Sequence, residues 1–274
     1  MKSRWALVAL FFAGISCAHL PGGTRMQQLR VMSYNIRSGN GDLATTAETI
    51  RSFSPDVVAL QEVDVHWFAR SNFADQATEL GQRLHMQVRF AHIYDLPPAR
   101  EGDPRREFGI ALLSRFQILS WSNRVITRLS TQDEKPVPAP MPGFLEANID
   151  VGGTTVRVFN THLDYRSDPS VRAQQVHDML GYIGDASGPT VLMGDLNASP
   201  GAAELQPLRA LLHDAWSDSW GPGFTYPAEK PEKRIDVVLV SSHFRVRSAK
   251  VPATLASDHR PVVVELVLSR APTQ

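Results

Sequence analysis

The stretch LEANIDVGGTTVRVFNTHL, residues 145–163, contains two strand-like segments and then a histidine. Residues 145–151 and 154–160 have strand composition, and the pair Gly152-Gly153 between them is a strong hairpin signal. The second segment runs directly into His162. Polar groups at the ends of several buried strands converge on one edge of a sheet, where a catalytic site can form. We therefore expect a strand-rich fold with His162 at the rim of a sheet.

Other polar segments follow apolar runs in the same way. Gly194-Asp-Leu-Asn197 follows residues 190–193, and Ser257-Asp-His259 follows residues 251–255, whose strand character is weaker. Nearer the N-terminus, residues 31–35 end in Asn35 and residues 57–62 end in Glu62. Together these predicted strand ends supply three carboxylates, two histidines and two carboxamides, namely Glu62, Asp195, Asp258, His162, His259, Asn35 and Asn197. Such a set of side chains suits a hard divalent cation and phosphate chemistry.

The predicted elements favour mixed sheets over a doubly wound parallel sheet. Further strands are predicted at residues 31–35, 57–62, 108–113, 117–120, 235–240 and 262–268. Helices are predicted at residues 42–53, with Asp42 as the cap, and at residues 72–84, 169–183 and 204–212. The proline-rich segment 130–143 is predicted to be an exposed loop. The predicted class is α/β (α+β), with mixed sheets packed face to face and covered by helices.

The composition indicates one ordinary globular domain. The chain has 274 residues, 43% of them hydrophobic and 20% charged, and no composition shift divides it. We predict a linker over residues 18–28, a domain over residues 29–268 and a tail over residues 269–274. The formal charge is zero, whereas a protein that binds nucleic acid usually carries a basic excess.

Residues 1–17 are predicted to be an export signal. Lys2 and Arg4 form a basic start, and the apolar run that follows is too short for a comfortable membrane span. Cys17, the only cysteine, follows small residues and resembles the cleavage site of a bacterial lipoprotein. Ordinary signal cleavage after Ala18 is the alternative, and a buried helix of a cytoplasmic protein is a third. We therefore expect a periplasmic or membrane-anchored lipoprotein, or a secreted protein.

The order of the motifs resembles the endonuclease/exonuclease/phosphatase superfamily of metal-dependent hydrolases. The matching segments, in chain order, are Ser33-Tyr-Asn-Ile36, Pro55–Glu62, Gly109–Ser114, Asn160-Thr-His-Leu163, Gly194-Asp-Leu-Asn197, Arg234-Ile-Asp236 and Ser257-Asp-His259. They span nearly the whole chain from Leu29 to Leu268. The resemblance implies a four-layer sandwich of two mixed β-sheets flanked by helices, with the active site at the edges of the two sheets.

The resemblance also implies a metal site. Glu62 and Asp258 are the expected carboxylate ligands of Mg²⁺, with Mn²⁺ as the alternative ion. Asn35 would lie beside them and hold a metal-bound water or a phosphate oxygen, although an asparagine that caps its own turn would look the same in sequence. Some relatives carry an aspartate two residues after this asparagine, and here that position is Arg37. The metal should therefore depend on Glu62, Asp258 and water.

The remaining site residues are assigned catalytic roles. Asp195 is expected to orient or deprotonate the attacking water, and Asn197 to hold the phosphate, although both residue types also occur in plain turns. His162 and His259 would provide the positive field, and which of them is the general acid stays open. Asp236 lies in an apolar run, so it needs a buried partner, which the resemblance identifies as His259.

Two more polar residues, Arg172 and Gln175, fall on one face of the helix predicted after His162. They are predicted either to hold the nearby loops or to form a surface salt bridge. The sequence thus predicts a Mg²⁺-dependent phosphodiesterase that acts on a lipid headgroup or another exported phosphodiester. A secreted or periplasmic endonuclease and a non-catalytic binding module are the alternatives. The expected partners are a phosphate-ester substrate and a membrane surface reached through lipidated Cys17, and the protein is expected to be a monomer without an obligate protein partner.

Overall fold

A computed structural model of the chain describes residues 27–217 and 220–269. The predicted signal segment and Cys17 lie outside these residues, as do most of the predicted linker and tail. The first strand begins at Gln28, one residue before the predicted start of the domain. Within the described ranges, no helix combines the length and the apolar character that crossing a membrane requires.

Two six-stranded sheets form the centre of the molecule, and each is mixed. The first has the order β11-β12-β1-β2-β4-β3, and the second has the order β5-β6-β7-β8-β10-β9. The strands of the first sheet are β1 (Gln28–Asn35), β2 (Val57–Val65), β3 (Gln87–Leu96), β4 (Arg106–Ser114), β11 (Phe244–Lys250) and β12 (Val262–Leu268). The strands of the second are β5 (Gln117–Arg128), β6 (Ala139–Val151), β7 (Thr154–His162), β8 (Thr190–Asp195), β9 (His213–Asp214) and β10 (Asp236–Val240). The pairs β1–β2 and β7–β8 are parallel, and the other pairs are antiparallel.

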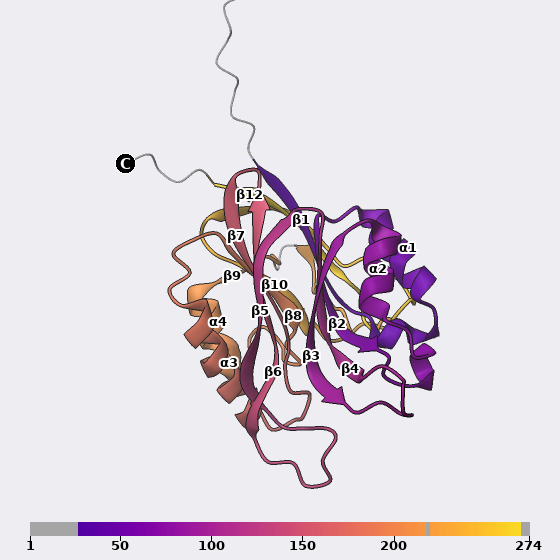
Figure 1. Cartoon of the computed structure of the whole chain (residues 1–274). Helices are drawn as coiled ribbons and strands as arrows, with labels where there is room; N and C mark the ends of the chain where they lie inside the picture. The colour runs from indigo at the N-terminus through magenta and orange to yellow at the C-terminus, as the bar shows by residue number, and fades with distance from the viewer. Residues whose placement is uncertain (1–26, 218–219, 270–274) are drawn as a thin grey trace, which may run out of the picture.

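Helices cover the outer face of each sheet, which gives four layers (Figure 1). They are α1 (Leu43–Phe53), α2 (Gln76–Leu84), α3 (Ser170–Ile183) and α4 (Gln206–Leu211), with short 3₁₀ turns η1 (Arg37–Gly41), η2 (Ala69–Ser71) and η3 (Ala203–Leu205). Helices α1 and α2 lie on the first sheet, and α3 and α4 lie on the second. The predicted four-layer sandwich is confirmed.

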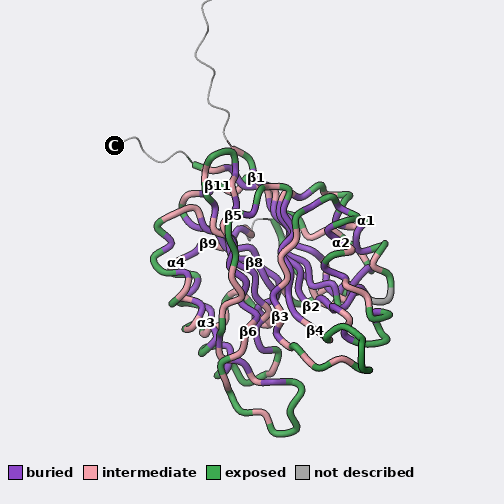
Figure 2. The backbone as a smooth tube through the Cα atoms, in the orientation of Figure 1, coloured by how far each residue is buried: buried purple, intermediate pink, exposed green. Residues whose placement is uncertain are grey.

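The core follows the period of two that strands impose on their side chains. Along β8, Val191 and Met193 point into the space between the two sheets, whereas Leu192 packs under α3 and α4. Along β1, Val31 faces between the sheets and Met32 faces α1 and α2. The central strands β1, β2, β8 and β10 are accordingly buried on both faces, whereas β3, β5 and β11 are partly exposed. Most of the other exposed backbone lies in the loops and the outer helices (Figure 2).

The sequence identified most elements but misplaced several boundaries. Residues 251–255 are not a strand, because β11 ends at Lys250 and Pro252 has no N–H to donate to a ladder. Residues 139–143 belong to β6, although their prolines predicted a loop. Strand β5 extends to Arg128 rather than ending at residue 120. Strand β3 was not anticipated, because its polar and apolar residues do not form a continuous apolar run.

The helices show the same pattern of correct type and shifted ends. Asp42 caps α1 as predicted, since its side chain accepts hydrogen bonds from the backbone N–H groups of Ala44 and Thr45. The second helix begins at Gln76 rather than at residue 72, because Asn72 and Phe73 adopt left-handed backbone angles and Asp75 supplies the cap. The predicted helix 204–212 is divided into η3 and α4.

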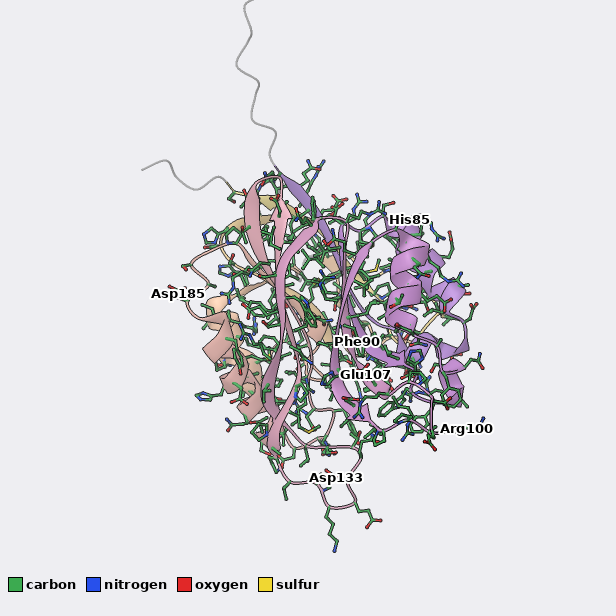
Figure 3. All side chains as sticks on the ribbon, viewed as in Figure 1. His85, Phe90, Arg100, Glu107, Asp133 and Asp185 are labelled. Atoms are coloured by element: carbon green, nitrogen blue, oxygen red, sulfur yellow. The ribbon has the colours of Figure 1, made fainter. Side chains whose placement is uncertain are left out.

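Strand ends from both sheets meet at one end of the molecule. Asn35, His162 and Asp195 are the last residues of β1, β7 and β8. Asp236 is the first residue of β10, which runs antiparallel to β8 and pairs it with Asp195. Glu62 does not end its strand, because β2 continues to Val65 after a register shift between Leu60 and Val63. Loops at the lower end of the view carry Arg100, between β3 and β4, and Asp133, between β5 and β6 (Figure 3).

Candidate active site

Three side chains form a buried polar network at the ends of β8 and β10. Asp195, Asp236 and His259 are each no more than 5% exposed. His259 Nδ1 donates to Asp236 Oδ2 across 2.9 Å, and His259 Nε2 lies 3.8 Å from Asp195 Oδ2. The predicted contact between Asp236 and His259 is therefore present. The ladder that pairs Asp195 with Asp236 places both carboxylates next to the same imidazole.

Burial and mutual charge shift the pKa values in this network. Burial first, and the Asp236 carboxylate second, raise the pKa of Asp195 to about 6, while His162 and His259 oppose this shift. Burial disfavours the charged form of His259, but attraction to Asp236 and the hydrogen bond with it raise the pKa of His259 to about 10. At neutral pH the network therefore contains a protonated imidazole beside a carboxylate that titrates close to neutrality.

His162 and Asn197 complete the second-sheet side of the site. His162 Nε2 lies 3.6 Å from Asp195 Oδ2, so both imidazoles approach the same oxygen of this carboxylate. The backbone N–H of Asn197 donates to Asp195 Oδ1 across 2.9 Å. The Asn197 side-chain amide donates to the carbonyl of Leu163, so it also connects the β8 turn to the loop after His162. Its predicted contact with phosphate stays a prediction.

Asn35 connects this network to Glu62. Its Nδ2 donates to Glu62 Oε1 across 2.9 Å and to Asp195 Oδ2 across 3.1 Å, while its Oδ1 accepts the N–H of Arg37. Asn35 is fully buried, whereas Glu62 is half-buried. Glu62 has a left-handed φ of 56°, an uncommon angle for a non-glycine residue that often marks a functional position. The register shift in β2 therefore aims this carboxylate toward Asn35.

Asp258 lies on the loop before β12, next to His259, and is half-buried. Its Oδ2 lies 3.5 Å from Nε of Arg37, whose side chain is 56% exposed. Ser257 ties this loop to the end of β1 by donating its hydroxyl to the carbonyl of Asn35 across 2.8 Å. The half-buried carboxylates of Glu62 and Asp258 are hard oxygen donors with access to solvent, which fits a divalent cation.

A second set of groups has the spacing for a metal. The ligand atoms of Asp195, Asp236 and His259 all lie within 4.8 Å of one another. Because the imidazole of His259 is protonated at neutral pH, a cation that binds either of its ring nitrogens would have to displace a proton. Asp236 Oδ1 is buried and has no hydrogen-bond partner among the described residues.

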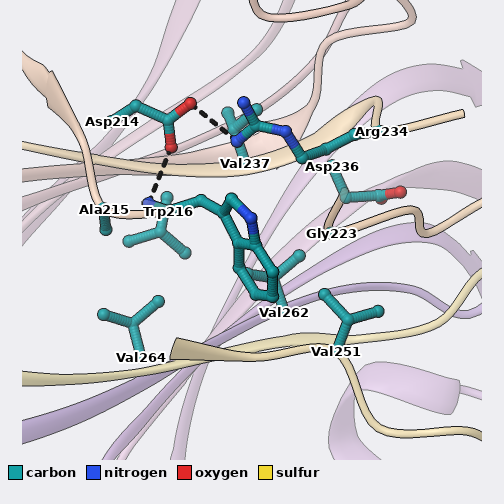
Figure 4. Close-up of a pocket in the computed structure, with 11 residues that line it drawn as sticks. Asp214, Ala215, Trp216, Gly223, Arg234, Asp236, Val237, Val251, Val262 and Val264 are labelled. Atoms are coloured by element: carbon teal, nitrogen blue, oxygen red, sulfur yellow. Dashed lines mark hydrogen bonds and ion pairs between the residues drawn. The ribbon is translucent and has the colours of Figure 1, made fainter. Parts of the chain in front are cut away.

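The segment between β9 and β10 packs against the loop that carries Asp258 and His259. The ring of Tyr226 lies 4.7 Å from the ring of His259, and the N–H of Ala228 donates to the carbonyl of Asp258. On the far side of Asp236, Arg234 pairs with Asp214 across 2.8 Å and does not pair with Asp236 (Figure 4). The Asp236 carboxylate is thereby left to His259. Sequence reasoning missed Tyr226, because a tyrosine beside a proline has no distinctive signal.

Buried carboxamides join the two sheets behind the site. Gln61 Nε2, on β2, donates to Asn160 Oδ1, on β7, across 2.8 Å, and Asn160 Nδ2 donates to the carbonyls of Leu60 and Ala111. Both side chains are fully buried. The only sequence signal for this pair was a carboxamide inside each of two apolar strands.

Arg172 and Gln175 hold the loop after His162, and the surface salt bridge considered as the alternative is not what the structure shows. Gln175 Oε1 accepts the N–H of Asp164, and Arg172 donates to the carbonyl of Asp164. Arg172 also pairs with Glu204 across 2.9 Å, with both side chains largely buried. Helix α3 therefore fixes the backbone that follows His162.

The fold and this arrangement of side chains can be compared with those of known protein families. The family model described as "Endonuclease/Exonuclease/phosphatase family" matches residues 32–259, which is most of the chain. The protein belongs to this family, whose members hydrolyse phosphoric esters. No curated protein sequence matches it significantly.

Solved structures with the same fold come from several organisms. An endonuclease/exonuclease/phosphatase from Beutenbergia cavernae is 25% identical, with a TM-score of 0.70 over 90% of this chain and 73% of that one. The human nocturnin catalytic domain with bound sulfate is 21% identical, with a TM-score of 0.67 over 89% of this chain and 96% of that one. The Bacteroides thetaiotaomicron mannosyl-6-phosphatase is 20% identical, with a TM-score of 0.60 over 88% of this chain and 100% of that one.

Proposed function

We propose that the protein is a metal-dependent phosphoric ester hydrolase whose preferred substrate is a phosphodiester. One observation carries this proposal. Asp195 lies 3.6 Å from His162 and 3.8 Å from His259, while Asn35 connects it to Glu62. A carboxylate between two imidazoles can aim and deprotonate water, and the imidazoles can stabilise a phosphoryl group as it gains negative charge.

Each residue of the network has a role that its environment supports. Asp195 orients the attacking water and accepts its proton, because a pKa near 6 leaves it ionised at neutral pH. His259, held in one orientation by Asp236, is protonated and donates a hydrogen bond or a proton through Nε2. His162 donates to a non-bridging phosphoryl oxygen.

We assign the metal to Glu62 and Asp258, with Asn35 beside them. Glu62 and Asp258 are half-buried and open to solvent. The alternative group of Asp195, Asp236 and His259 is buried, and its imidazole is protonated at neutral pH. When bound, Mg²⁺ or Mn²⁺ supplies positive charge that stabilises the anionic phosphoryl group. The chain itself contributes the carboxylates of Glu62 and Asp258, and the Asn35 amide sets the position of Glu62.

The proposed substrate is a lipid headgroup diester or another exported phosphodiester. The balanced net charge of the chain disfavours a nucleic acid, which normally requires a basic surface. One structural neighbour is named as a mannosyl-6-phosphatase, and that activity belongs to that protein. Because this name denotes hydrolysis of a phosphomonoester, a monoester must be included in any test of this chain.

A substrate panel tests the proposal. Bis-p-nitrophenyl phosphate, p-nitrophenyl phosphate, plasmid DNA, sphingomyelin and phosphoinositides are each assayed with Mg²⁺, with Mn²⁺ and with excess EDTA. We expect turnover of diesters that requires metal, with a lipid diester preferred. Preferred cleavage of plasmid DNA would favour the endonuclease instead. Full turnover in EDTA would refute metal dependence, and no turnover of any ester would favour a non-catalytic binding module.

The lipid substrate is linked to the proposal that Cys17 is a lipid anchor. A lipoprotein-type modification carries more than one acyl chain, which gives stable membrane attachment and brings headgroups within reach of the site. Native protein should then partition into the membrane fraction, and Cys17→Ser should change that partition. Mass spectrometry of the mature N-terminus decides the point, because an unmodified chain that starts at His19 would show ordinary secretion.

A further inference from the structure

Arg128 is a buried cation directly behind His162, and neither the motifs nor the proposed chemistry uses it. It is the last residue of β5 and is 7% exposed. Its guanidinium donates to three backbone carbonyls: Nε to Pro142 across 2.9 Å, Nη1 to His162 across 2.9 Å and Nη2 to Gly143 across 2.7 Å. One side chain therefore joins the start of β6 to the end of β7.

The charge of Arg128 has no carboxylate in contact with it among the described residues. Arg172, which is also deeply buried, pairs with Glu204 across 2.9 Å. Asp164 acts on Arg128 only from a distance and is itself paired with Arg166. Burial lowers the pKa of Arg128 to about 10, which leaves the guanidinium charged at neutral pH.

An uncompensated buried cation is unfavourable, whereas carbonyls alone can be satisfied by a neutral amide. A positive charge at this position therefore suggests a function beyond holding the backbone. The site in front of it is rich in acid, since Glu62, Asp195, Asp236 and Asp258 all lie at the same rim. An anionic phosphoryl group entering this rim gains from any fixed positive charge behind it.

We propose that Arg128 is a positioning residue that acts through His162 and supplies fixed positive charge that favours binding of a phosphoryl group. The inference rests on the proposed function for its substrate class. Its two parts are separable, because the hydrogen bonds to Pro142, Gly143 and His162 set the position of the imidazole, and the charge acts on the phosphoryl anion at longer range.

Two substitutions separate the two parts. Arg128→Gln removes the charge and keeps an amide donor, so the Kd of inorganic phosphate should rise about tenfold, the effect of one unit charge at ~10 Å in a dielectric of ~20. Arg128→Lys keeps the charge but cannot reach three separate carbonyls, so the Kd of phosphate should stay within about threefold. Its kcat on bis-p-nitrophenyl phosphate should fall about tenfold or more, because His162 loses its fixed position.

The matched control is Arg124→Gln, four residues earlier on the same strand. Arg124 pairs with Glu146 across 2.8 Å and has no contact with the site residues. Titration calorimetry with inorganic phosphate is carried out on metal-free and Mn²⁺-loaded protein well below the melting temperature. Both Arg128 variants lose the contact with three carbonyls, so the difference between their Kd values for phosphate isolates the charge. The control should bind phosphate like the wild type.

A folded Arg128→Gln protein with wild-type phosphate affinity would overturn the charge part of the proposal. If that variant does not fold, weakened phosphate binding by Arg128→Lys would overturn it instead. Unchanged kcat in Arg128→Lys would overturn the positioning part. Phosphate binding is measured without turnover, so failure of the panel on the wild type would refute the proposed function and leave the charge effect to be judged separately.

Discussion

The two sides of the site differ in how firmly the fold holds them. Asp195, Asp236 and His259 are almost completely buried and bonded to one another. Glu62 and Asp258 are half-buried, and the partner of Asp258 is an arginine that is itself more than half exposed. Proton-transfer groups need a dry environment that shifts their pKa values, whereas metal ligands need an approach from solvent. In the proposed function, this difference in burial separates two kinds of chemistry within one rim.

The backbone shows the same contrast. Asp195 and Asp236 are ordinary ladder partners, so their relative position is set by strand pairing. Glu62 and Arg37 have left-handed φ angles of 56° and 45°, which ladder geometry does not provide. The two buried carboxylates are thus positioned by regular structure, whereas His259 comes from the loop before β12. The open side is positioned by local distortions that the surrounding contacts maintain.

The largest expected effect comes from breaking the buried side. Asp236→Asn should lower kcat by about 10³- to 10⁴-fold, because His259 loses the acid that orients and charges it. Steady-state kinetics on bis-p-nitrophenyl phosphate measures this effect. A circular dichroism spectrum must show that the variant is folded, and a folded variant with the wild-type rate would refute the role of the pair.

A smaller effect is expected on the open side. Glu62→Gln should weaken Mn²⁺ binding by about 100-fold and lower the rate at limiting metal, with high metal concentration restoring part of the activity. Calorimetric titration of Mn²⁺ measures the affinity. Glu79→Gln, on the exposed face of α2, is the control. Equal Mn²⁺ affinity in the wild type and in Glu62→Gln would place the metal elsewhere.

The pH dependence of stability sharpens the comparison, because the His259 pKa rises from 6.5 to about 10 in the folded protein. A raised pKa stabilises the fold fully below the unfolded value and loses that contribution as pH rises through the folded value. The free energy of unfolding of metal-free protein should therefore fall between pH 6.5 and about 10, as urea denaturation can measure. His259→Gln should remove this slope, and His213→Gln should keep it. A flat wild-type curve would argue against the charged pair.

The smallest effect is expected outside both sides. Asp75 caps α2 by accepting the N–H of Thr78 across 2.9 Å. Asp75→Ala should lower the free energy of unfolding by about 1 kcal/mol and leave kcat unchanged. Thermal unfolding and the phosphodiester assay measure the two quantities. A large loss of kcat in this variant would mean that the outer helices affect the site, contrary to this prediction.

Sequence reasoning predicted the parts of this molecule that follow from local patterns. The packed sheets and the clustering of the strand-end residues follow from apolar runs that end in polar groups. The hairpin follows from the glycine pair Gly152-Gly153. A buried partner for Asp236 was predicted because an unpaired buried aspartate is unfavourable, and the family resemblance identified that partner as His259. The catalytic roles and the metal ligands stay predictions, because geometry shows what these groups can do and turnover shows what they do.

What could not be predicted depends on contacts between distant segments. The ion pair between Arg37 and Asp258 joins residues more than 200 positions apart, and Tyr226 reaches His259 through a loop with no periodic pattern. Arg128 gave no sequence signal because its partners are backbone carbonyls, which every residue has. Strands β3 and β11 were missed because partly exposed strands lack a continuous apolar run.

The buried carboxamides of Gln61 and Asn160 have a consequence for how this enzyme can change. Glu62 and His162 belong to different sheets, and these two amides, adjacent to Glu62 and two residues before His162, bond across the gap between the sheets. This hydrogen bond fixes the position of β2 relative to β7, and so of one sheet relative to the other. A substitution there would leave every proposed reacting group intact and yet alter the distance between the proposed metal-binding and proton-transfer groups. We therefore expect turnover to depend on the stacking of the two sheets as well as on the residues at their rim.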